Sequence, residues 1–287
     1  LEALQVADAE GAVPVGKITQ TLSRDYTKGE YVDGKWQKGT TGAANNRDGE
    51  SPMGILVGNM LRDGQMATLP NAPDFGVTNP GGLRSELWNT QAEFGAAAVP
   101  GLADGTISFS QANAVLPFNN TLALVTLTGA QFTTLLEQQW QRGPDGSVPQ
   151  RPYLQLGLSD NVHYTYDAAL PEGQRITSVT VNGAPIDPAA SYRIGTFSFL
   201  ATGGDNFRVF QQGTDYVDTG LVDYEAWMDY IADGSPRAPS FAKHAVQASG
   251  VPAKTTAGEA VTFQVGGLNL TSRGAPENTT LQVALGD

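Results

Sequence analysis

Residues 175–187, RITSVTVNGAPID, carry the strongest short-range signal for antiparallel pairing in this chain. Two alternating segments flank Asn182-Gly183, and Asn-Gly suits a two-residue hairpin turn because both turn positions need a positive φ. Other alternating segments, among them VHYTYD and YRIGTFSFL, meander between separated helical patterns. The mixture predicts an α+β fold rather than a doubly wound parallel sheet.

Helical periodicity is clearest at residues 52–63, where apolar side chains recur at the spacing of one helix face. Ser51 fits the N-cap, Pro52 the first turn and Gly64 the C-terminal stop. Three more helical segments are predicted: a short turn at 110–114 capped by Ser110, an amphipathic helix at 129–140 and another at 223–234.

Charge and composition exclude several classes of function. The formal net charge is −12, which argues against binding a nucleic-acid backbone or an anionic membrane, but not against one small phosphorylated ligand. Cys is 0, so no disulfide, thiolate nucleophile or zinc–sulfur site can form. His is only 2, too few for a histidine-rich two-metal phosphoesterase site. His163 is expected on a strand surface and His244 in a linker.

The sequence changes in character after Pro239. Residues 244–287 contain alternating β-branched segments and no helical pattern, and about 44 residues are few for a complete β-sandwich of roughly 100. We therefore interpret residues 239–287 as a linker and the start of an all-β (Ig-like) domain. Residues 1–238 are expected to form one domain, with 1–13 as a linker remnant.

The ends of the chain suggest a fragment. The sequence starts at Leu1 without a Met, and no apolar run approaches the roughly 18 residues of a membrane span. We expect an excised piece of a longer protein.

Residues 199–207, FLATGGDNF, are the most informative for function. Gly203 and Gly204 allow positive φ or close approach of a ligand, and they place Asp205 on a tight turn. The flanking aromatic rings suit a planar ring that carries hydroxyls, such as a nucleoside. The alternative is a strand-end turn with hydrophobic anchors.

Four more features accompany this stretch: Arg47 before a capped helix, NPGGLR, LPFNN and YLQLG. In order and spacing they resemble the C-terminal domain of the 5′-nucleotidase family, which includes periplasmic UDP-sugar hydrolases and ecto-5′-nucleotidases. There the stretches run roughly R..E.xMGNL, NGGGIR, LPFGN, FLQVSG and FLANGGDGF. The resemblance covers about residues 14–238 and implies a layered α/β/β/α sandwich that binds nucleotides.

The resemblance also implies roles for single residues. Arg47 and Arg84 match arginines that bind substrate phosphates, as the guanidinium fork suits an anionic oxygen. Phe118 and Phe199 match the aromatics on both faces of the base. Asp205 matches the carboxylate that accepts hydrogen bonds from the ribose hydroxyls.

Three further positions match the family's pocket. Asn79 corresponds to an Asn that touches the nucleoside, and Asn120 and Gly157 correspond to other pocket positions. The alternatives are structural: Arg47 could pair with Asp48 or Glu50, the two phenylalanines could be core residues, and Asp205 could cap a turn.

The chain departs from the family pattern at three positions. Pro80 stands where the family has Gly, which stiffens the turn and removes a donor. Asn206 replaces the usual Gly of GGDGF, and Asn tolerates left-handed geometry. Gly49 lies where some relatives carry a second Arg. These changes bear on fine specificity.

In the family, catalysis belongs to a separate N-terminal metallophosphoesterase domain with two metal ions, and its motifs are absent here. The resemblance thus implies a substrate-binding domain of a secreted bacterial 5′-nucleotidase or UDP-sugar hydrolase, extracellular or attached to the cell wall. Alone it would bind nucleotides and hydrolyse them negligibly. The alternatives are a nuclease, a 2′,3′-cyclic-nucleotide phosphodiesterase, and a non-catalytic cell-surface module.

Overall fold

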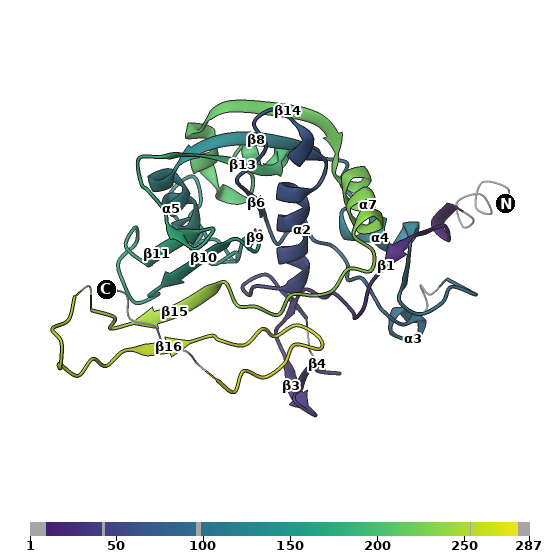
Figure 1. Ribbon diagram of the computed structural model, residues 1–287, viewed down its shortest axis with the longest axis horizontal. Helices are drawn as coiled ribbons and strands as arrows, with labels where there is room; N and C mark the ends of the chain where they lie inside the picture. The colour runs from purple at the N-terminus through teal and green to yellow at the C-terminus, as the bar shows by residue number, and fades with distance from the viewer. Residues whose placement is uncertain (1–9, 42–43, 96–98, 253, 281–287) are drawn as a thin grey trace.

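Two five-stranded sheets form the centre of the computed structural model, which describes residues 10–41, 44–95, 99–252 and 254–280 (Figure 1). The first sheet has the strand order β14 (Thr214–Val222), β8 (Thr121–Thr128), β13 (Ser191–Phe197), β6 (Phe75–Thr78), β9 (Gly157–Leu158). The second has the order β12 (Ala184–Pro185), β11 (Ile176–Val181), β10 (Val162–Tyr166), β15 (Ala245–Ser249), β16 (Gln264–Gly266). Each sheet contains parallel and antiparallel pairs, so the predicted α+β class is confirmed.

Helices and small ribbons surround the two sheets. The α-helices include α2 (Pro52–Asp63), α3 (Gln91–Phe94), α4 (Phe109–Val115), α5 (Gly129–Glu137), α6 (Ser198–Ala201) and α7 (Asp223–Asp233). The 3-10 turns are η1 (Gln65–Thr68), η3 (Gly204–Asn206) and η4 (Arg208–Gln212). Two-stranded ribbons pair β1 (Pro14–Lys17) with β7 (Thr106–Ser108), β2 (Asp25–Tyr26) with β5 (Asn45–Asn46), and β3 (Gly29–Val32) with β4 (Lys35–Lys38). In the described part of the chain, no helix is long and apolar enough to cross a membrane.

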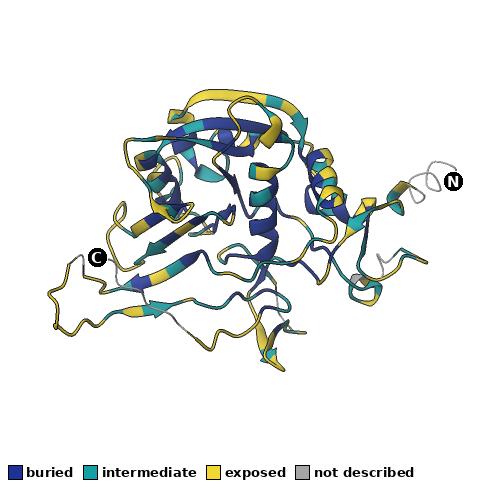
Figure 2. Ribbon diagram, in the orientation of Figure 1, coloured by how far each residue is buried: buried dark blue, intermediate teal, exposed yellow. Residues whose placement is uncertain are grey.

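The alternation of β8 separates two hydrophobic cores. Leu122 and Leu124 point into a cluster with α2, α4 and α7, whereas Ala123 and Val125 point into a cluster with α5 and the second sheet. Figure 2 shows α2 and the central strands buried, while the edge strand β14 is largely exposed. One face of the first sheet thus packs on α2, α4 and α7, and the other packs on α5 and the second sheet. The full α/β/β/α sandwich stays a prediction.

The predicted limits of α2 are confirmed. Ser51 Oγ accepts a hydrogen bond from the Gly54 N–H at 3.1 Å, and Pro52 begins the helix. The Gly64 N–H donates to the Met60 carbonyl and ends it. The hairpin turn is confirmed as well, since Asn182 and Gly183 both have positive φ.

Two helix predictions need correction. The helix expected over 129–140 ends at Glu137, because Trp140 forms a β-bridge with Tyr153 instead. The helical turn expected to be capped by Ser110 begins one residue earlier and is capped by Ser108, whose Oγ accepts from the Gln111 N–H at 3.3 Å.

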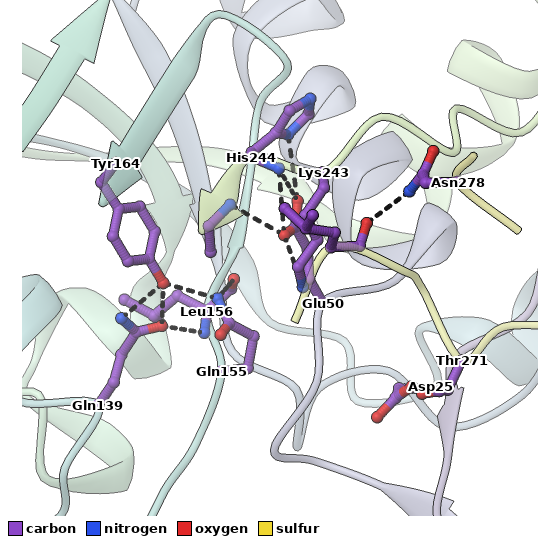
Figure 3. A network of polar contacts seen from close by, with 12 residues as sticks. Asp25, Glu50, Gln139, Gln155, Leu156, Tyr164, Lys243, His244, Thr271 and Asn278 are labelled. Carbon is purple, nitrogen blue, oxygen red and sulfur yellow. Dashed lines mark hydrogen bonds and ion pairs between the residues drawn. The ribbon is translucent and has the colours of Figure 1, made fainter. Parts of the chain in front are cut away.

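The C-terminal segment contributes to the second sheet, although it was expected to begin another domain. β15 pairs in parallel with β10, and β16 pairs with β15. His244, expected in a linker, is only 4% exposed. The carboxylate of Glu50 accepts hydrogen bonds from the N–H groups of His244 and Ala245 and lies 3.2 Å from Lys243 Nζ (Figure 3). The strands β15 and β16 therefore extend the sheet of the main domain, while the boundary at 239 stays a prediction.

Close packing of α2 on the first sheet depends on Gly76 of β6. A Cβ at this position would lie 2.0 Å from the Gly58 carbonyl oxygen of α2, which is backbone and cannot rotate away. We expect Gly76→Ala to lower the free energy of unfolding by about 1–3 kcal/mol or more, because the helix must shift away from the sheet. Urea unfolding measures the loss. Gly266→Ala is the matched control, since a Cβ there meets nothing closer than 3.9 Å, and equal midpoints for the two variants would contradict this packing.

Asp25 makes the stability of the fold depend on pH. Its carboxylate is buried and accepts hydrogen bonds from Asn46 Nδ2 and from Thr271 Oγ1. The contact with Thr271 joins the C-terminal segment to β2, and Figure 3 shows Asp25 beside Thr271. Burial raises the pKa of Asp25 to about 6, although those two hydrogen bonds oppose the rise. A raised pKa means that the folded state favours the protonated form. This contribution to stability is therefore complete below about pH 4 and is lost as the pH rises through about 6.

Asp25→Asn should remove this dependence. We expect the variant to be more stable than the wild type at pH 7, by up to about 3 kcal/mol, and to show a flatter profile between about pH 4 and 6. Urea midpoints across that range measure the effect, with Asp33→Asn at an exposed turn as the control. A profile as steep as that of the wild type would show that another group titrates.

Candidate functional site

A cavity of about 280 Å³ opens at one edge of the first sheet. β6 and β13 end at this edge, and β8 begins there because it runs antiparallel to β13. The residues that line the cavity come from the loops at these strand ends, from the segment before α2 and from the start of α7: Arg47, Asn79, Gly81, Gly82, Leu116, Phe118, Asn120, Phe197, Phe199, Asp205 and Asp223. The structure thus brings together all predicted site residues except Arg84 and Gly157.

Two exposed phenylalanines stand on the cavity wall. Phe118 is 53% exposed and Phe199 is 45% exposed, so neither is a core residue. Phe197 and Leu116 are buried and give this part of the cavity an apolar floor. The Phe199 ring lies against the backbone of Gly204, where a Cβ would come within 2.5 Å of it. The arrangement offers flat apolar faces at the solvent boundary.

Asp205 lies on a turn of unusual backbone conformation beside these rings. Its φ is 51°, and Gly203 before it has φ 88°. Asn79 Nδ2 donates a hydrogen bond to Asp205 Oδ2 at 2.5 Å. Gly81 lies next to this pair, since a Cβ there would be 3.0 Å from the same oxygen. Because Gly81 has no side chain, the Asp205 carboxylate stays open to the cavity, and one of its oxygens is bound by Asn79.

Arg47 is held through its backbone and brings positive charge to the cavity. Its carbonyl accepts a hydrogen bond from the Gln155 N–H at 2.8 Å, within the YLQLG stretch. Burial lowers the pKa of Arg47, and repulsion from Arg151 and then Arg84 lowers it further, while Asp205 opposes the shift. The guanidinium therefore lies in a group of cations, an arrangement suited to an anion.

The alternative that Arg47 forms a surface ion pair finds no support. Glu50 pairs with Lys243 instead. Within the described ranges, the ion pairs of the structure do not include Arg47. Arg151 is the cation that sequence reasoning missed; it precedes YLQLG by two positions, but charge alone did not distinguish it from other surface arginines.

Arg84 and Gly157 lie outside the cavity lining. The Arg84 guanidinium carbon is 5.5 Å from the centroid of the Phe118 ring, so it flanks the cavity from outside. Gly157 is buried against α2, where a Cβ would be 2.8 Å from the Cα of Gly54. Substrate contacts by these two residues stay predictions.

Asp223, the first residue of α7, was missed as a lining residue. Its Oδ2 accepts hydrogen bonds from the Asn120 N–H at 3.0 Å and from Asn120 Nδ2 at 3.2 Å, and its own N–H donates to the Asn120 carbonyl. Burial raises the pKa of Asp223, and the hydrogen bonds from Asn120 and Tyr224 oppose this. Asn120 thus uses its amide donor to fix the loop that carries Phe118. Asp223 lies about 100 residues away in the sequence, and no local pattern signals the pairing.

In the part of the chain that the structure describes, no group of three or more His, Asp or Glu side chains is placed to hold a metal ion. Apolar rings, a carboxylate and a guanidinium line the cavity wall.

Sequence comparison identifies relatives of the chain. The model of the family "5′-nucleotidase, C-terminal domain" matches residues 28–212. Protein UshA of Salmonella pullorum is 32% identical over 158 residues, which cover 54% of this chain and 26% of that protein. Cell wall protein Lmo0130 of Listeria monocytogenes is 33% identical over 182 residues, which cover 62% of this chain and 21% of that protein. The chain therefore spans about a quarter or less of the length of these relatives.

Structural comparison agrees with the sequence match. The 5′-nucleotidase precursor of Thermus thermophilus superposes with a TM-score of 0.60 at 26% identity, covering 85% of this chain and 42% of that one. The NAD nucleotidase of Haemophilus influenzae has a TM-score of 0.57 at 21% identity, covering 85% of this chain and 39% of that one, which shows the shared fold alone. This chain belongs to the 5′-nucleotidase C-terminal domain family.

Proposed function

We propose that the chain is the nucleotide-binding domain of a secreted 5′-nucleotidase or UDP-sugar hydrolase. The observation that carries the proposal is one cavity that joins two exposed phenylalanine rings, the Asn79–Asp205 pair and the Arg47 guanidinium. These groups match the three parts of a nucleotide in their chemistry: an aromatic base, a ribose with hydroxyls and a phosphate.

Each part of the ligand has a physical reason to bind where we place it. Phe118 and Phe199 stack on the base, which contributes roughly 1–3 kcal/mol per base and tolerates different bases. Asp205 accepts hydrogen bonds from the ribose hydroxyls through the oxygen that Asn79 leaves free. Arg47, with Arg84 and Arg151 nearby, binds phosphate oxygens, and the bound anion relieves the repulsion among the guanidinium groups.

Hydrolysis belongs in this proposal to the longer protein. An N-terminal metallophosphoesterase domain with two divalent metal ions would break the phosphate bond, and the present domain would present the nucleotide to it. Because one relative is named a cell wall protein, we place the longer protein outside the bacterial cell or on its wall. Nucleic acid is not an expected partner of this domain, given its net charge of −12.

Isothermal titration of the purified chain with adenosine, AMP and UMP tests the proposal. We expect measurable binding of each nucleoside or nucleotide and no release of phosphate from AMP. A folded domain that binds none of the three at millimolar concentration would contradict the proposal.

A second candidate function is that the same domain belongs to a phosphoesterase that acts on a wider range of substrates. A relative from Bacillus subtilis, 28% identical over 184 residues, is named a trifunctional nucleotide phosphoesterase. A nuclease or a 2′,3′-cyclic-nucleotide phosphodiesterase would use the same cavity for the base and ribose. Assays of the longer protein on AMP, UDP-glucose, a cyclic nucleotide and an oligonucleotide separate these activities. A non-catalytic surface module would act on none of them.

A further inference from the structure

The side chain of Asn206, the residue after Asp205, makes two hydrogen bonds that anchor the turn. We propose that Asn206 is a positioning residue, which fixes the Asp205 carboxylate in the cavity and so sets the preference for ligands with ribose hydroxyls. The inference rests on the proposed function, because it needs Asp205 to contact the ribose. It assigns a purpose to a position where the family pattern has glycine.

The backbone of this turn needs outside support. Asp205 and Asn206 have φ of 51° and 63°, two consecutive residues with side chains in the left-handed region. Each is strained there, although Asp and Asn tolerate this region better than most residues. A turn of this kind stays in one conformation only when its surroundings determine it.

The side chain of Asn206 supplies that support at both ends of its amide. Its Nδ2 donates to Gln141 Oε1 at 3.0 Å, and its Oδ1 accepts from Arg208 Nη2 at 2.7 Å. A glycine could make neither bond. Since donor and acceptor are both engaged, the amide fixes the orientation of the residue that follows Asp205.

The two partners of Asn206 are themselves anchored. Gln141 is 1% exposed, and its Nε2 donates to the Gln138 carbonyl at 2.9 Å. Arg208 Nη2 also donates to the Arg142 carbonyl at 2.9 Å. The turn is therefore attached to the segment after α5 by residues that do not line the cavity.

The side chain of Asp205 makes fewer hydrogen bonds than that of Asn206. Asn79 Nδ2 donates a hydrogen bond to its carboxylate, and Asn79 also lines the cavity. Without the bonds of Asn206, the carboxylate can turn away from the ribose position. Phe118 and Phe199 belong to other segments, the loop that Asp223 fixes through Asn120 and the helix α6. The expected defect is selective for the sugar and spares the base.

The experiment compares adenosine with 2′,3′-dideoxyadenosine, which keeps the base and lacks both hydroxyls. Calorimetry gives both affinities for the wild type, for Asn206→Gly and for Arg208→Met, which removes the 2.7 Å donor. We expect each variant to bind adenosine roughly 5- to 30-fold more weakly and to bind the dideoxy ligand within about twofold of the wild type. The double variant should lose no more adenosine affinity than the single variant with the larger loss, because both substitutions remove the same hydrogen bond between Arg208 and Asn206.

Controls separate positioning from general destabilisation. Asn182→Gly changes another left-handed asparagine, in the hairpin turn, and should leave both affinities unchanged. Urea midpoints report folding, and if Asn206→Gly does not fold, Arg208→Met decides the question. Equal loss of both ligands, or no loss of either, overturns the positioning role while the proposed function stands. A wild type that binds neither ligand overturns both.

Discussion

Phe199→Ala is expected to weaken adenosine binding by roughly 5- to 150-fold. The estimate follows from about 1–3 kcal/mol for stacking one base on an aromatic ring, at about 1.4 kcal/mol per factor of ten. The ring is 45% exposed and lies on the backbone of Gly204, so its loss removes a ligand surface and leaves the core intact. Calorimetry with adenosine measures the change, and UMP should show a similar loss because stacking tolerates different bases.

The control for this variant is Tyr216→Ala. Tyr216 is 48% exposed on the edge strand β14 and does not line the cavity. Its removal should change neither the affinity nor the urea midpoint by much. An unchanged adenosine affinity in Phe199→Ala would show that the ring is a surface anchor and not part of a base site.

Arg47→Met is expected to act on the phosphate alone. Hydrogen bonds to charged groups contribute about 1.5–3 kcal/mol, so AMP affinity should fall roughly 10- to 100-fold while adenosine affinity changes less than about twofold. The wild-type preference for AMP over adenosine should also shrink as ionic strength rises, since salt screens the partly exposed guanidinium groups. Methionine keeps much of the length of the side chain and removes its charge.

Arg62→Met is the matched control, because Arg62 pairs with Asp160 outside the cavity lining. It should leave the ratio of AMP to adenosine affinity unchanged. If Arg47→Met lowers both affinities equally, Arg47 supports the cavity wall and does not bind phosphate.

The sequence predicted correctly those helices and turns whose end residues are of a type that caps a helix or adopts a positive φ. Ser51 and Gly64 mark α2 because capping satisfies backbone groups at the helix ends, and Asn182-Gly183 marks the hairpin because of its positive φ values. The helix α5 was predicted too long, since a bridge from Trp140 to Tyr153 competes with its last turn. A bridge between residues distant in the sequence cannot be predicted from the residues of the helix alone.

The same distinction explains the C-terminal segment. Its alternation correctly indicated strands, but alternation does not reveal which sheet a strand joins. β15 pairs with β10, and its first residues are bound by the buried Glu50, which accepts hydrogen bonds from the N–H groups of His244 and Ala245 almost 200 residues later. Sequence spacing offered no reason to connect them.

The candidate site was predictable where several motifs occur in a fixed order. Phe118, Phe199 and Asp205 were identified through such motifs, and the structure places all three on one cavity. Asp223 was missed because it acts through Asn120, and Arg151 because a single surface arginine carries no pattern. Both depend on contacts that only the folded chain creates.

A crystal structure of this chain with AMP decides whether the cavity is a nucleotide site. We expect adenine between the rings of Phe118 and Phe199, ribose hydroxyls on Asp205, and the phosphate beside Arg47. AMP bound elsewhere, for example in the separate cavity lined by Trp140 and Arg208, would contradict it. So would a cavity that remains empty in crystals grown with saturating AMP.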